Sequence, residues 1–121
     1  MKIPEKELFA VIGDDNDIRF VLKDRNGTAV SLLGAIVEFS VKDAETDSND
    51  DALIYRTNEY NQGVNILDPP SNGICEVVIP PELTESLSSY NYYWDLKITF
   101  ASGKVKRPIK GRYVLDQSVT K

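Results

Sequence analysis

Apolar and polar residues alternate along several short segments of the chain. The clearest segment runs from Tyr92 to Phe100, where apolar side chains occupy every second position and residues such as Asp95 and Lys97 lie between them. Successive side chains of a β-strand point to opposite faces of a sheet, so this period of two is typical of a strand with one buried face. The pattern predicts a strand at 92–100 that supplies the middle of a core.

The same period recurs at 18–23 and 35–42, with Val21 as the apolar residue that breaks the first pattern. Six further strands are predicted at 8–12, 52–57, 64–67, 74–79, 105–109 and 112–116. Turn-forming Gly, Asn, Asp and Pro residues separate these segments, and only residues 81–87 could form a helical turn. Short strands at this spacing favour a sandwich or a barrel.

We therefore predict an all-β fold, a two-sheet antiparallel immunoglobulin-like β-sandwich with at most one short helical turn. The chain has 121 residues, which fits a single domain spanning 1–121. The predicted core consists of Ile18, Phe20, Leu22, Val37, Phe39, Val41, Val77, Ile79, Tyr92, Trp94, Leu96, Ile98, Tyr113 and Leu115.

Cysteine content and hydropathy bear on where the protein is found. The lone cysteine, Cys75, has no partner for an internal disulfide, and we expect it to be a small buried apolar residue. The first residues lack the apolar stretch of an export signal, and no segment reaches the roughly 20 apolar residues that span a bilayer. We expect a protein made in the cytoplasm that does not enter a membrane.

The charge is unevenly distributed. The formal net charge is -5, which disfavours nucleic acid as a partner because such binding depends on cations that neutralise phosphates. An acidic run at 43–51 includes Asp47, Asp50 and Asp51, and a basic run at 104–112 includes Lys104, Lys106, Arg107 and Lys110. Both runs fit solvated loops and strand faces, and they also fit contacts between neighbouring protein copies.

The chain contains no histidine, which removes the usual general base of nucleophilic hydrolases and the imidazole ligand of metal sites. Phosphate-binding and dinucleotide-binding glycine motifs and paired C-x-x-C motifs are also absent from the sequence. A glycosidase needs only two carboxylates, but also a deep cleft, which a sandwich of this length has little chain to build. We predict a protein that is not an enzyme and that uses no cofactor and no metal.

Two acidic bends invite a calcium hypothesis. Asp47, Asn49 and Asp51 match the start of an EF-hand loop, but Ala52 stands where the loop needs glycine and Asn58 where it needs a bidentate glutamate. The residues 13–17 form a second acidic bend. We interpret both as solvated acidic loops.

An aromatic run suggests a ligand-stacking site. Tyr92 and Trp94 lie at apolar positions of the alternation and are expected in the core, whereas Tyr90 and Tyr93 are the members that could stack on a sugar ring. A carbohydrate-binding or receptor-binding sandwich is therefore an alternative function.

Several short motifs resemble a family of phage proteins. Gly13-Asp14 leads into a strand ending Leu22-Lys23-Asp24, and this is followed by the turn glycine Gly27, by Leu32-Leu33-Gly34-Ala35 and by Val37-Glu38-Phe39-Ser40-Val41. The second half contains Pro81-Glu82-Leu83-Thr84-Glu85-Ser86-Leu87, the strand Tyr92-Tyr93-Trp94-Asp95, Gly103 with Gly111, and Val119-Thr120. The chain is similar to small phage and prophage virion proteins of the type seen in the N-terminal domain of the baseplate upper protein family.

That resemblance implies a structural or assembly module of a bacteriophage or prophage particle, in its tail, baseplate, neck or capsid. It implies other virion proteins as partners and a homo-oligomeric state, with the basic and acidic runs as the candidate protein contacts. The expected location is the virion, after synthesis in the host cytoplasm. The carbohydrate-binding alternative and the solvated-surface interpretation of the charged runs both stay open from the residues alone.

Overall fold

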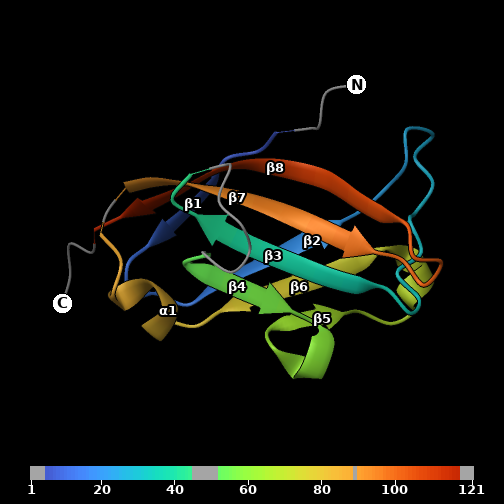
Figure 1. Ribbon diagram of the computed structural model, residues 1–121, viewed down its shortest axis with the longest axis horizontal. Coiled ribbons are helices and arrows are strands. Elements are labelled where there is room, and N and C mark those ends of the chain that lie inside the picture. The colour runs from blue at the N-terminus through green and yellow to red at the C-terminus, as the bar shows by residue number, and fades with distance from the viewer. Residues whose placement is uncertain (1–4, 45–51, 89, 118–121) are drawn as a thin grey trace.

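The computed structural model describes residues 5–44, 52–88 and 90–117. About half of them lie in eight strands that pack as two sheets, and the connections include one short α-helix and two 3-10 turns (Figure 1). The elements are β1 (Leu8–Val11), β2 (Asn16–Val21), β3 (Ile36–Lys42), β4 (Ile54–Thr57), η2 (Glu59–Asn61), β5 (Val64–Ile66), η3 (Pro70–Asn72), β6 (Ile74–Ile79), α1 (Glu82–Glu85), β7 (Tyr90–Thr99) and β8 (Val105–Asp116).

The strand order defines the fold class. One sheet has five strands in the order β1-β8-β7-β3-β4, and the other has three in the order β2-β6-β5. In an immunoglobulin sandwich the second, fifth and fourth strands form one sheet, and the third, sixth and seventh form the other. Here β4 is an additional strand after the third, so β2, β6 and β5 form the first of these sheets, and β3, β7 and β8 lie in the other together with β1 and β4. The predicted immunoglobulin-like β-sandwich is confirmed.

Two details of the predicted fold were wrong. The β1 strand runs parallel to β8, with Leu8 paired to Tyr113, so the sandwich is not wholly antiparallel. A parallel pair needs a long crossover connection, and here the intervening strands of the domain supply it. The structure also contains η2 and η3 in addition to α1, because the turns at Glu59–Asn61 and Pro70–Asn72 tighten into single 3-10 turns.

The period-two pattern identified the core. Thirteen of the fourteen predicted core residues are buried, and Ile18 is half-buried and packs against the others. Cys75 is buried, as expected for a small apolar side chain. The predicted core omitted eight other buried residues, which are Leu8, Leu32, Ala35, Ser40, Ile54, Thr57, Val64 and Thr84.

The predicted strands at 105–109 and 112–116 form one continuous strand, β8. Gly111 does not interrupt it, because this glycine pairs with Trp94 within the β7–β8 ladder. The backbone of Lys6 lies so close to Gly111 that a Cβ atom would collide with the Lys6 carbonyl oxygen. Here glycine admits a neighbouring chain segment and does not form a turn.

Three aromatic side chains connect the two sheets at the centre of the core. Phe20 of β2 lies 5.5 Å from Trp94 of β7 and 6.3 Å from Phe39 of β3, measured between ring centroids, and Phe39 stacks on Trp94 at 5.7 Å. Aromatic pairs at such distances add about 0.5–1.5 kcal/mol each beyond the burial of their area. This cluster spans the sandwich where antibody domains place their inter-sheet disulfide and its packed tryptophan.

Candidate functional site

The outer face of the five-stranded sheet carries the polar half of each alternation. Glu38 on β3 accepts a hydrogen bond from the Tyr55 hydroxyl at 2.7 Å and lies 4.0 Å from the Lys97 ammonium group. Asp95 on β7 lies 3.8 Å from the Arg107 guanidinium group. Burial, the hydrogen bond to Glu38 and the charge of that carboxylate together raise the pKa of Tyr55 to about 12. These charges are engaged with one another across neighbouring strands.

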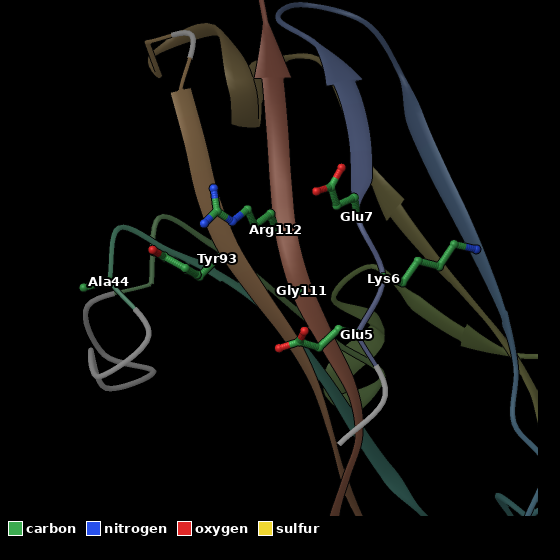
Figure 2. Close-up of a pocket in the computed structure, with 7 residues that line it drawn as sticks. All are labelled: Glu5, Lys6, Glu7, Ala44, Tyr93, Gly111 and Arg112. Atoms are coloured by element: carbon green, nitrogen blue, oxygen red, sulfur yellow. The ribbon is translucent and has the colours of Figure 1, made fainter. Parts of the chain in front are cut away.

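A hollow of about 640 Å³ lies on this face around Tyr93. Its lining comes from three parts of the chain: the segment 5–7 before β1, Ala44 just after β3, and the β7–β8 pair, which contributes Tyr93, Gly111 and Arg112. Figure 2 shows the carboxylates of Glu5 and Glu7 and the guanidinium group of Arg112 on the same side as the Tyr93 ring, whereas Lys6 points the opposite way.

Hydrogen bonds attach the segment 5–7 to the β7–β8 pair. The indole Nε1 of Trp94 donates to the Lys6 carbonyl oxygen at 2.9 Å, and the Lys6 amide donates to the Lys110 carbonyl oxygen at 2.9 Å. Because Gly111 has no side chain, the Lys6 backbone can approach β8 closely. The position of Glu5 and Glu7 beside Tyr93 follows from these contacts.

The structure separates the two tyrosines that the sequence suggested for stacking. Tyr93 is half-buried in the hollow on the outer face. Tyr90 is 57 % exposed at the start of β7, where it packs edge-on against Tyr92 at 5.3 Å. The two rings do not line one pocket, so they do not form a paired platform for a sugar.

The basic run is also divided. Lys104 is exposed in the turn between β7 and β8, and Lys106 and Arg107 are exposed at the start of β8. Lys110 lines a small recess beside Tyr93 and Asp95. Asp47, Asp50 and Asp51, the acidic candidates, lie outside the described residues.

A second hollow was not predicted from the sequence. It has a volume of about 510 Å³ and lies between the two sheets, on the open side of the sandwich along β2 and the first half of β8. We call it the β2–β8 groove, and its lining residues are Phe20, Val21, Leu22, Lys23, Val30, Ile98, Phe100, Lys106, Arg107, Pro108 and Ile109.

Two sequence signals mark this groove in retrospect. Val21 is an apolar residue at a polar position of its alternation, and it is 53 % exposed. Pro108 stands inside β8, where the β7–β8 register shifts by one residue between Leu96 and Ile98. Proline is confined to edges and bulges of sheets, so its presence in a predicted strand indicates an edge that lacks a partner.

Polar chemistry elsewhere in the described ranges is sparse. Within residues 5–44, 52–88 and 90–117, no group of three or more Cys, Asp or Glu side chains is placed to hold a metal ion. Every buried side-chain nitrogen or oxygen atom of the described residues has a hydrogen-bond partner. No helix in the part of the chain that the structure describes is long and apolar enough to cross a bilayer.

Comparison with known proteins yields likeness to solved structures alone. No family model and no curated protein sequence matches the chain. A chain in the crystal structure of ICOS in complex with ICOS-L and an anti ICOS-L VNAR domain matches with a TM-score of 0.40 and 11% identity over 96% of this chain, which spans 56% of that chain. The RIG-5 IG1 homodimer matches with a TM-score of 0.44 and 15% identity, over 93% of this chain and 90% of that chain.

Proposed function

We propose that this protein is a non-enzymatic assembly module of a bacteriophage or prophage particle that acts through contacts with other virion proteins and with copies of itself. The observation that carries the proposal is the apolar outer surface of the edge strand β1. Phe9 is 66% exposed and Val11 is 36% exposed, and both belong to a strand whose outer edge has no described neighbour. The resemblance to small virion proteins supports the same function.

Physical reasoning connects this surface to assembly. Edge strands present backbone donors and acceptors that can pair with another chain, and natural proteins usually protect them with charge, proline or a covering segment. β1 contains neither a charged residue nor a proline, since its sequence is Leu8-Phe9-Ala10-Val11. Pairing of β1 with a neighbouring chain would bury Phe9 and satisfy the free backbone groups together.

Mass spectrometry of purified particles from the source phage or prophage tests the proposal. The chain should be present at a stoichiometry comparable to other virion proteins. A photo-crosslinking amino acid at Phe9 should give a crosslink to a virion protein, whereas the same group at Tyr60, which is 87% exposed on η2, should give none. Absence of the chain from washed particles would overturn the assignment.

Carbohydrate binding is the second candidate, favoured by the hollow around Tyr93. An aromatic face beside the carboxylates of Glu5 and Glu7 and the guanidinium of Arg112 offers stacking together with hydrogen-bond donors and acceptors (Figure 2). A glycan array probed with the wild type and with Tyr93→Ala tests it, because a sugar that stacks on Tyr93 should bind only the wild type. Tyr90→Ala is the matched control and should leave such binding unchanged.

A further inference from the structure

The strand β2 has an unused edge. It pairs with β6 on one side, and no described strand lies on the other. The Leu22 amide, just after β2, donates to the Gly73 carbonyl oxygen on the β6 side. Val78 of β6 lies opposite Asp17 of β2, but its amide faces away from β2 and donates to the Gly63 carbonyl oxygen on the β5 side. Because donors alternate between the two sides of an antiparallel strand, the backbone N–H and C=O groups of Arg19 and Val21 point to the open edge.

The β2–β8 groove runs along this edge. Phe20 and Leu22 from one sheet and Ile98 and Ile109 from the other line its apolar interior. A strand added along β2 would place every second side chain into the groove while its backbone pairs with Arg19 and Val21. The volume of about 510 Å³ lies within the roughly 300–1,000 Å³ that ligand pockets occupy.

The charged side chains at the rim of the groove indicate which kind of partner it binds. Lys23 and Lys106 are exposed at the rim of the groove, although the chain as a whole carries a net charge of -5. A partner segment with acidic side chains at the rim is attracted to these cations.

We propose that the β2–β8 groove binds an extended segment of another protein, with alternating apolar and acidic residues, which adds to β2 as a further strand. This deepens the proposed function by naming the chemical class of one partner. It does not depend on the surface of β1. Peptide binding in solution needs no particle, so the two ideas fail independently.

The probe is a short fluorescent peptide in which valine and glutamate alternate, titrated into the full chain. A peptide that alternates valine and lysine has the same apolar pattern with the opposite charge, and it should bind at least about tenfold more weakly. N-methylation of the peptide amides that face β2 should abolish binding, because it removes the backbone donors. Equal binding of all three peptides, or binding of none, would overturn the proposal.

Two sets of variants locate the site. Val21→Pro removes an outward N–H from an edge strand, a position where proline is tolerated, and should prevent binding, whereas Val21→Thr should not. Lys23→Glu combined with Lys106→Glu should also prevent it, and the equal charge change Lys42→Glu with Arg112→Glu on the outer face should not. The charge variants test the site even where the proline variant fails to fold.

Amide hydrogen exchange gives the direct structural readout. Bound peptide should slow exchange at Arg19 and Val21, whose amides point to the open edge, and leave Tyr55 on the distant strand β4 unchanged. Binding without this protection would contradict strand addition. A chain that lacks residues 1–4 should bind the probe equally well. Binding that appears only after their removal would identify the occupant as the chain's own beginning and overturn the proposal.

Discussion

Trp94 joins three parts of the molecule through one side chain. Its ring packs against both Phe20 and Phe39, and its Nε1 donates a hydrogen bond to the Lys6 carbonyl oxygen. Trp94→Ala should lower the free energy of unfolding by about 3–5 kcal/mol, as truncation of buried aromatic residues does. Tyr93→Ala, on the opposite face of the same strand, should cost far less. Chemical denaturation measures both, and the reverse order would mean that the register of β7 is shifted by one residue.

A substitution at Gly111 tests how the segment 5–7 packs against β8. Alanine there would place a Cβ against the Lys6 carbonyl oxygen, so either the segment or β8 must shift. We expect Gly111→Ala to destabilise the fold by about 1–3 kcal/mol, as overpacking does, and to change the fluorescence of Trp94. An unaltered stability together with an unaltered emission spectrum would show that Lys6 does not lie over this glycine.

Cys75 links stability to pH. Burial raises the pKa of its thiol from 9.0 to about 11. The folded state therefore holds its proton more tightly than the unfolded state, so this contribution is complete below pH 9 and is lost as the pH rises toward 11. The stability difference between the wild type and Cys75→Ala should shrink across that window. A difference that stays constant in denaturation at several pH values would contradict the burial of the thiol.

At the scale of elements, the short helix α1 is held by a buried polar contact. The Thr84 hydroxyl accepts a hydrogen bond from the Gly13 amide at 3.0 Å and donates to the Pro81 carbonyl oxygen at 3.1 Å. Thr84→Val keeps the shape but leaves the Gly13 amide without its partner, which should cost about 1–3 kcal/mol. Thr84→Ser retains the hydroxyl and should recover most of the loss in a thermal melt.

The strands were predictable because each has one buried and one solvated face. The alternation at 92–100 placed Trp94 and Leu96 in the core, and both are buried. The boundary at Gly111 was wrong because glycine is usually read as a turn signal, whereas here it accommodates a segment more than 100 residues away in the chain. Local patterns contain no information about such distant contacts.

The surfaces were less predictable than the core for the same reason. The basic run was treated as one patch, but the structure places Lys106 in the β2–β8 groove and Lys110 beside Tyr93. The groove forms because β2 and the first half of β8 lie opposite one another and no strand of the described residues lies between them. Strand order, which alternation does not specify, determines which side chains share a surface.

At the scale of the whole molecule, copies of the chain could associate through the apolar surface of β1 or through the charged residues of the basic run. A homo-oligomer formed through β1 should persist at high salt and dissociate after Phe9→Asp. An oligomer formed through the basic run should dissociate at high salt, because screening shortens from about 8 Å at physiological ionic strength to about 3 Å at 1 M. It should also dissociate after Lys106→Glu with Arg107→Glu. Sedimentation velocity separates the two, and a monomer under all conditions would refute self-association.

The pairing of β1 with β8 has a consequence for the order in which the chain can fold. Leu8 meets Tyr113 and Val11 meets Asp116, so the first described strand completes its ladder only with the last. Contacts of such long sequence separation slow folding, because the loop between them must be closed before they are formed. During synthesis, β1 has no pairing partner and Phe9 stays exposed until β8 has been translated. We expect this interval to be the period when the nascent chain is most prone to aggregate.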